Sequence, residues 1–378
     1  MANSVMIFGL GDLGGWVLEL LARCEGISKI VTCDNRDEWG TKKTHTAAEG
    51  AILQGKYKTF EFHKCDARNI DATAELIRTV NPTVIYNDMT LASWWVGRSL
   101  FPEQAKKWDR MMALSYPLHA VLAIKLMQAV KESGTNAPVL NNSYPDVTNP
   151  VLCRNGLCPL VGSGNFDLLV AEIKWKIHLA WHVSISEITI FMVGEHALVM
   201  LGPREGVPYF LKVLVRGKDV TSQFDVVSLI ADRLTASGPG ETTWISHPRV
   251  AASAVGHLMS ILNDTNEFTH APGPCGLPGG YPIRLGAKSA EVILPEGLTL
   301  EEATRINLES MRCEGIEEIK DDGTVVITDE GRAIAKEMLE LDYPKTVPFA
   351  DIEGVAKELT GAYKRIIDKK NLPLPVFS

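Results

Sequence analysis

Short apolar or β-branched runs alternate with longer segments of helical period through the first 160 residues. Strands are predicted at Ser4–Phe8, Lys29–Cys33, Thr59–His63, Val84–Asn87 and Val139–Asn141. The segments between them have the spacing of amphipathic helices: Leu13–Cys24, Thr44–Leu53, Ala72–Val80 and Glu103–Lys131. Alternating strands and helices predict βαβ units around a parallel sheet, so residues 1–160 are expected to form a doubly wound α/β domain.

After about residue 160 the pattern changes, and residues 161–378 are expected to form an α+β domain with C-terminal helices. The predicted elements are a helix at Phe166–Trp181, strands at Ser186–Val193 and Tyr209–Val215, and helices at Val226–Ala236, Pro248–Leu262 and Ile352–Lys369. Another helix begins at Thr299, where Thr299 and Glu302 have the spacing of a capping box. The last eight residues, NLPLPVFS, are apolar and are expected to pack on their own or a neighbouring subunit.

The amino-acid composition and the charge of the chain disfavour several classes of function. The 378 residues are 46% apolar and 22% charged, with a net charge of −8 and no basic cluster, which disfavours a nucleic-acid partner. The N-terminus enters a glycine-rich turn without a basic leader or a long apolar run, so a cytoplasmic protein without a membrane partner is expected. Seven scattered cysteines predict a reducing compartment and no metal site.

A glycine signature follows the first predicted strand and opens the first helix, as Gly9-Leu-Gly11-Asp-Leu-Gly14. In a βαβ unit such glycines permit a tight turn, a close approach of backbone N–H groups to a pyrophosphate, and close packing of helix on strand. Asp34 ends the second strand, where a carboxylate accepts hydrogen bonds from ribose hydroxyls. The pattern predicts a Rossmann-type domain that binds NAD, since Asp34 would repel a 2′-phosphate; nearby Arg36 leaves NADP open.

Among the nine histidines, His196 has the most informative context. It follows a predicted strand in the tight turn Val193–Ala197, where a side chain projects into a cleft more readily than into a core. His178 and His182 are spaced i, i+4, but no accompanying carboxylate pattern suggests a metal site there.

Several motifs in order along the chain resemble the lactate/malate dehydrogenase superfamily. GLGDLG with Asp34 is similar to the nucleotide-binding start of that family. The segments TAAEGAILQG (Thr46–Gly55), Thr148–Val151, Gly162–Asp167, Gly194–His196, Gly280–Gly286 and Leu298–Glu302 resemble its later motifs. The resemblance implies a dehydrogenase that transfers a hydride between a CH–OH carbon and nicotinamide, and a homodimer or homotetramer with a small-molecule substrate.

The resemblance also assigns roles to particular residues. His196 would be the general acid/base, Asp167 would orient its imidazole, and Asn149 would hold the substrate oxygen or the nicotinamide end of the cofactor. The implied cofactor contacts are Gly9, Gly11, Asp12, Leu13, Gly14, Asp34, Asn35, Asn87 and Asn149.

The sequence departs from the family pattern in its substrate site. The family carries a carboxylate-binding Arg one helical turn after the catalytic Asp, but here Asp167 is followed by Leu168, Leu169 and Val170. A substrate bulkier or less acidic than lactate or malate is therefore expected. The residues expected to contact it are Trp94, Trp95 and Arg98 in a predicted loop, and Ser246 and Arg249 at a helix start.

Two alternatives remain open at this stage. One is an NAD- and metal-dependent glycosidase of related fold, for which Cys153, Cys158 and His196 could bind a divalent metal. The other is an NAD-binding sensor without catalysis, which the missing Arg favours and the presence of His196 and Asp167 disfavours.

Overall fold

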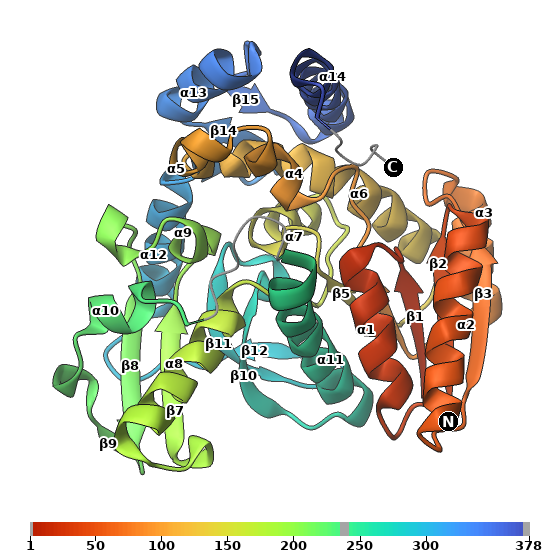
Figure 1. Cartoon of the computed structure of the whole chain (residues 1–378), viewed down its shortest axis with the longest axis horizontal. Helices are drawn as coiled ribbons and strands as arrows, with labels where there is room; N and C mark the ends of the chain where they lie inside the picture. Colours follow the sequence, from red (N-terminus) through yellow and green to blue (C-terminus); the bar gives the residue numbers. More distant parts are fainter. Residues whose placement is uncertain (1–2, 235–241, 373–378) are drawn as a thin grey trace.

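The computed structural model describes residues 3–234 and 242–372, and its core is a six-stranded parallel sheet in the order β3-β2-β1-β4-β5-β6 (Figure 1). Its strands are β1 (Ser4–Phe8), β2 (Lys29–Asp34), β3 (Thr59–Lys64), β4 (Val84–Asn87), β5 (Val139–Asn141) and β6 (Val161–Gly162). The five strands predicted from the sequence are confirmed, and β6 is added. The order reverses between β1 and β4, where open α/β sheets form a crevice at the carboxyl ends of their strands.

Strand alternation explains why helices cover both faces of this sheet. Met6 and Phe8 of β1 belong to the core on the α3 and α6 side, whereas Val5 and Ile7 belong to the core under α1 and α2. Side chains along a strand point alternately to opposite faces, so an all-apolar strand needs cover on both. The helices of this half are α1 (Asp12–Arg23), α2 (Asp37–Leu53), α3 (Ile70–Val80), α4 (Trp94–Ser99), α5 (Ala105–Asp109), α6 (Tyr116–Ser133) and α7 (Pro145–Arg154).

The second half joins the sheet domain through helices and two small antiparallel sheets. Its elements are α8 (Phe166–Trp181), β7 (Ile188–Val193), α9 (His196–Met200), β8 (Phe210–Val215), β9 (Lys218–Asp219), α10 (Val226–Ala231), α11 (His247–Asn263), β10 (Glu267–Pro272), β11 (Gly280–Leu285) and β12 (Ala290–Val292). Helix α11 packs along α1, so its N-terminus lies beside the glycine turn (Figure 1).

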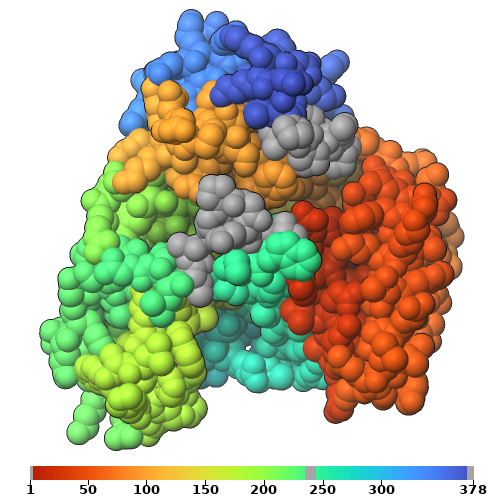
Figure 2. Space-filling view, in the orientation of Figure 1, coloured from red at the N-terminus to blue at the C-terminus, as the bar shows by residue number. Residues whose placement is uncertain are grey.

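The C-terminal part forms a module that sits on α4, α5 and α6 (Figures 1 and 2). Its elements are β13 (Ile316–Ile319), β14 (Val325–Ile327), α13 (Asp329–Leu339), β15 (Thr346–Val347) and α14 (Ile352–Lys370). Helix α12 (Leu300–Arg312), which leads into the module, packs beside α9. The buried Trp108 ring contacts the ring of Phe101 and also that of Tyr363, which belongs to α14. Each centroid distance is 5.8 Å. Lys370 lies 4.3 Å from the Phe101 ring centroid. The module thereby fixes the segment that follows β4.

Several predicted boundaries are wrong. The long helix expected over Glu103–Lys131 is broken into α5, a 3₁₀ turn at Met112–Ser115 and α6, whose start is set by Pro117. Trp94 and Trp95 lie in α4 rather than in a loop. The helix predicted at Val226–Ala236 ends at Ala231, and its last two residues lie outside the described chain. The capping box of Thr299 and Glu302 is confirmed.

One stretch, Met112–Ser133, is long and apolar enough to cross a membrane by length and composition, but 89% of its most apolar window is buried inside the fold. A central core helix passes the same test. The apolar C-terminal tail that was expected to pack on a subunit lies outside the described residues from position 373 onward.

Candidate functional site

The glycine turn between β1 and α1 has the shape that its sequence predicts. Gly9 has φ +94°, a conformation that L side chains rarely adopt. A Cβ on Gly14 would lie 2.0 Å from the Gly9 carbonyl oxygen, so helix and strand approach too closely for any side chain there. A Cβ on Gly11 would meet no described atom within 4 Å, so this position opens onto free space.

That free space is a cavity of about 300 Å³ at the carboxyl ends of the strands. Of the expected cofactor contacts, those at its wall are Gly9, Gly11, Asp12, Leu13, Asp34 and Asn35, while Gly14 is buried beneath the turn. The N-terminus of α1 faces the cavity with Gly11 as its cap, which offers no side chain to occupy the first backbone N–H groups. Asp88 accepts from the N–H of Gly14, and the N–H groups before it, at the tip of the helix, are suited to a phosphate group. These residues fit a dinucleotide.

Asp34 lies at the end of β2, at the wall of the same cavity. It accepts hydrogen bonds from the backbone N–H of Leu10 at 2.8 Å and from the Nε and Nη2 atoms of Arg36 at 3.0 and 3.1 Å. Burial alone would raise its pKa, but the hydrogen bonds from Arg36 and Leu10 hold the pKa below its usual value. The group is therefore an ionised acceptor at neutral pH. The Arg36 side chain is half exposed and lies over the Trp39 ring.

At the ends of β4 and β5, the expected cofactor contacts Asn87 and Asn149 are not among the described residues that line the cavity. Asn87 and Asn149 form an internal chain with Asn141: Asn87 donates to Asn141 and Asn141 donates to Asn149, both at 2.8 Å. Asn149 lies inside α7, not in a turn after the fifth strand. Asn142 instead lines the cavity and donates to Asp88 at 2.9 Å, and burial raises the pKa of Asp88 to about 7.

His196 is the first residue of α9, and its partner is Glu314 rather than Asp167. The imidazole Nδ1 lies 2.8 and 3.0 Å from the two carboxylate oxygens of Glu314. The Tyr144 hydroxyl donates to the same carboxylate at 2.6 Å. Glu314 is fully buried between α12 and β13, in a turn completed by Gly315 at φ +105°. No described residue bonds the imidazole Nε2. His196 is 5% exposed and is not among the described lining residues, but its ring contacts Tyr144, which also contacts the lining residue His119.

The surroundings of His196 favour its charged form. Burial opposes the imidazolium, but the carboxylates of Glu314, Asp146 and Asp109 raise the pKa of His196 above 6.5. Burial raises the pKa of Asp146, and burial together with the neighbouring carboxylates of Glu314 and Asp146 raises that of Glu195 well above its usual value. A buried imidazole with a raised pKa, one nitrogen fixed and the other open, is suited to donating a proton at neutral pH.

Asp167 lies elsewhere, at the start of α8 against α11. It hydrogen-bonds Ser253, and its carboxylate is 3.9 Å from His257 Nε2. Burial raises the pKa of Asp167 to about 7 and lowers that of His257 to about 4. The expected contact between Asp167 and His196 is not formed, because the start of α8 packs Asp167 against α11, whereas His196 lies against Glu314.

Replacing Asp167 by Asn is expected to stabilise the protein at pH 8 more than at pH 5. Because folding raises the pKa of this carboxyl from 3.8 to about 7, folding favours its protonated form, and stability is lost as the pH rises through that range. The gain at pH 8 should be on the order of 1–3 kcal/mol. Urea unfolding at both pH values measures it, and an equal effect at both would contradict this assignment.

Of the expected substrate contacts, Trp94 and Trp95 line the cavity, but Arg98 is bound to protein. Its Nε and Nη2 atoms donate to the two oxygens of Asp109 at 3.1 and 3.3 Å. Asp109 is buried, so this two-pronged ion pair fixes α4 against α5. Arg98 therefore stabilises the packing of α4 on α5.

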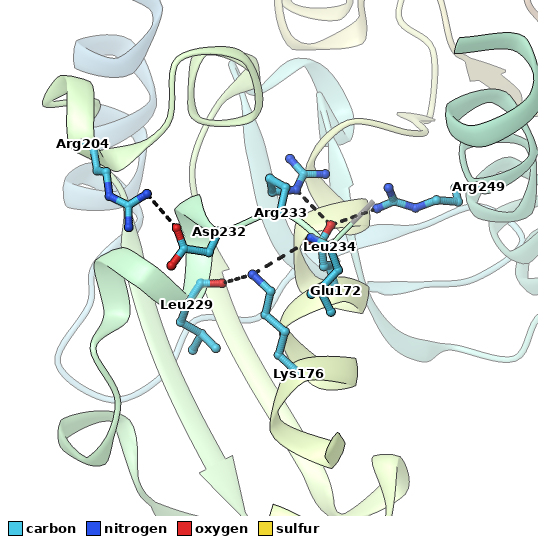
Figure 3. A network of polar contacts seen from close by, with 8 residues as sticks. All are labelled: Glu172, Lys176, Arg204, Leu229, Asp232, Arg233, Leu234 and Arg249. Carbon is cyan, nitrogen blue, oxygen red and sulfur yellow. Dashed lines mark hydrogen bonds and ion pairs between the residues drawn. The ribbon is translucent and has the colours of Figure 1, made fainter. Parts of the chain in front are cut away.

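Arg249 is likewise bound to protein. Figure 3 shows Arg249, Arg233 and Lys176 converging on the buried Glu172 of α8, with nitrogen–oxygen distances of 3.4, 2.9 and 3.9 Å. Ser246 lies in the π-helical turn Thr242–Ser246 that precedes α11, and its neighbour His247 lines the cavity.

The metal ligands considered for a glycosidase are not available together. Cys153 at the end of α7 and Cys158 form a disulfide, although thiols were expected from the sequence. Within residues 3–234 and 242–372, no group of three or more His, Cys, Asp or Glu side chains could hold a metal ion.

No family model matches the sequence, and no curated protein matches it. Solved structures do match in fold. Lactate dehydrogenase from Cryptosporidium parvum, complexed with lactic acid and nicotinamide adenine dinucleotide, superposes with a TM-score of 0.59 at 16% identity, covering 89% of this chain and 98% of that one.

Two malate dehydrogenases are similar in the same way. That of Cryptosporidium parvum has a TM-score of 0.57 at 17% identity, covering 83% of this chain and 98% of its own. That of Plasmodium falciparum, in complex with NADH, has a TM-score of 0.56 at 16% identity, covering 82% and 95%. The chain therefore has the fold of lactate and malate dehydrogenases.

Proposed function

We propose that the protein is an NAD-dependent oxidoreductase that interconverts a secondary alcohol and a ketone. The observation that carries the proposal is the convergence of the Gly9–Gly14 turn and Asp34 on one cavity in a fold shared with NAD-bound dehydrogenases. The ionised Asp34 supports NAD over NADP, because a carboxylate accepts from ribose hydroxyls and repels a 2′-phosphate. When bound, the nicotinamide ring would supply or accept the hydride.

In this proposal His196 is the general acid/base. During reduction its Nε2 would give a proton to the carbonyl oxygen as the carbon receives the hydride, and during oxidation it would take the hydroxyl proton. Glu314 holds Nδ1 and stabilises the imidazolium, and Tyr144 holds Glu314. Both expected arginines are bound to protein carboxylates, Arg98 to Asp109 and Arg249 to Glu172. This supports a neutral ketone over a 2-oxo acid.

The test is NADH consumption by the purified protein with matched panels of neutral ketones and 2-oxo acids. We expect turnover of neutral ketones, with a loss of roughly 100- to 10,000-fold in His196→Ala. The same variant should bind NADH as the wild type does, because the described wall of the cavity does not include His196. NADH binding without turnover on either panel would contradict an oxidoreductase and favour a nucleotide-binding sensor.

A further inference from the structure

His119, which the sequence analysis left without a role, lines the same cavity near Trp94 and Ser143. It lies in the first turn of α6 and is 8% exposed. Its ring and that of His196 both contact Tyr144, at centroid distances of 5.9 and 5.0 Å. A second imidazole therefore stands close to the proposed acid/base and faces the space in which a ligand would bind.

The hydrogen bonds of Thr90 favour one tautomer of His119. The hydroxyl of Thr90 has one proton, and its acceptors are the carbonyls of Ala92 at 2.8 Å and Leu118 at 3.1 Å. The same oxygen lies 3.2 Å from His119 Nδ1. A proton on Nδ1 lets both groups bond at once, since the ring then donates to the hydroxyl and the hydroxyl donates to a carbonyl, so this tautomer is favoured. In a neutral ring Nε2 is then an acceptor with a free lone pair.

The ring also stays neutral. Burial, with a smaller contribution from the charge of His196, lowers the pKa of His119 to about 4. No described residue bonds Nε2. A lone pair at a cavity wall attracts a donor such as a hydroxyl and repels a carboxylate.

The nearby imidazolium of His196 is taken up by the reacting oxygen in the proposed reaction, and no arginine or lysine among the described lining residues lies next to His119 to attract a carboxylate. The guanidinium groups among the described lining residues belong to Arg36 and Arg68, which follow β2 and β3. His119 and Ser143 lie by β4 and β5, toward the other edge of the sheet. The half of the cavity next to His119 is walled instead by Trp94, Trp95 and Leu122.

We propose that the substrate is a hydroxyketone or the corresponding vicinal diol, and that His119 Nε2 accepts a hydrogen bond from the hydroxyl next to the reacting carbon. This inference rests on the proposed function, with His196 serving the reacting oxygen and His119 the neighbouring one. His119 is then a specificity-determining residue. A monocarboxylate in its place would put an anion against a lone pair.

The experiment compares acetoin, butanone and 2-oxobutanoate, which share a four-carbon skeleton, and the bulkier pair 2-hydroxyacetophenone and acetophenone. In the wild type we expect kcat/KM for each hydroxyketone to exceed that for its plain ketone by at least about tenfold. In His119→Phe this ratio should fall toward one, and His119→Gln, which keeps an acceptor, should retain part of it. His45→Phe, on the exposed face of α2, is the matched control and should keep the ratio.

Two results would overturn the inference: 2-oxobutanoate as the best substrate, or an unchanged ratio in His119→Phe. If His119→Phe instead weakens NADH binding about tenfold with the ratio kept, the imidazole serves a cofactor hydroxyl, which also overturns it.

A binding measurement separates this inference from the proposed function. If no ketone is turned over, the thermal shift of the NADH complex with acetoin and butanone is measured in wild type and His119→Phe. A His119-dependent preference for acetoin would support the ligand class while the proposed reaction fails. Equal shifts for both compounds would overturn both proposals.

Discussion

Replacing Glu314 by Gln is expected to lower kcat for ketone reduction by roughly 100- to 10,000-fold, the range for removing or misdirecting a general acid. Glutamine has nearly the same shape, so it can still contact His196 Nδ1 and the Tyr144 hydroxyl. It has no charge, and Glu314 is the principal group that raises the pKa of His196 against burial. The imidazolium then loses its stabilisation.

The pH profile distinguishes this role from a merely structural one. For ketone reduction His196 must hold a proton, so kcat/KM should be constant at low pH and fall as the pH rises through the pKa of His196. In the wild type that pKa lies above 6.5, and in Glu314→Gln the fall should move to lower pH. Steady-state kinetics between pH 5 and 9 measures this, with NADH affinity as a check on folding.

Asp167→Asn is the matched control, because Asp167 contacts Ser253 and His257 instead of His196. Its pH profile should match that of the wild type. If Asp167→Asn moves the profile and Glu314→Gln does not, the assignment of Glu314 is wrong. Tyr144→Phe, which removes only the hydroxyl bond to Glu314, should cause a smaller loss than Glu314→Gln.

The contrast between Glu314 and Asp34 shows what the sequence could predict. Asp34 is identified by its place after a strand and by its distance from a glycine turn, both of which are local. Glu314 lies 118 residues from His196, at the start of a module whose packing on α6 decides the contact. No local pattern marks it among 46 acidic residues. When packing brings together side chains from distant segments, their contact leaves no pattern of fixed spacing in the sequence.

The place of Asn142 at the cavity wall, unlike that of Glu314, has a local signal in the sequence. Pro145 is the first residue of α7, the position that proline favours, and Tyr144 before it has φ +48°. A helix beginning at Pro145 encloses Asn149 and leaves Asn142 at the end of β5. Choosing the later Asn-Pro pair as a turn ignored that Pro145 could start a helix and that Pro150 could lie within it.

Replacing Gly11 by Val is expected to abolish NADH binding while leaving the fold intact. Gly11 has φ −65° in an extended conformation that other residues adopt, and its Cβ would meet no described atom within 4 Å. The isopropyl group would instead fill the space in front of the α1 N-terminus, where the pyrophosphate is proposed to bind. The Kd for NADH should rise at least about 100-fold, since no other approach to those N–H groups remains.

Substitutions at two further glycines separate an effect on NADH binding from an effect on stability. Gly14→Ala places a Cβ 2.0 Å from the Gly9 carbonyl oxygen, so it should lower thermal stability as well as binding. Gly256→Ala on the exposed face of α11 meets no described atom within 4 Å, so it should leave NADH binding unchanged and raise thermal stability slightly, because alanine favours the helical backbone. Fluorescence titration with NADH and thermal unfolding measure both properties. If Gly11→Val binds NADH as tightly as the wild type, the dinucleotide does not lie on this turn, because the new side chain would occupy its place.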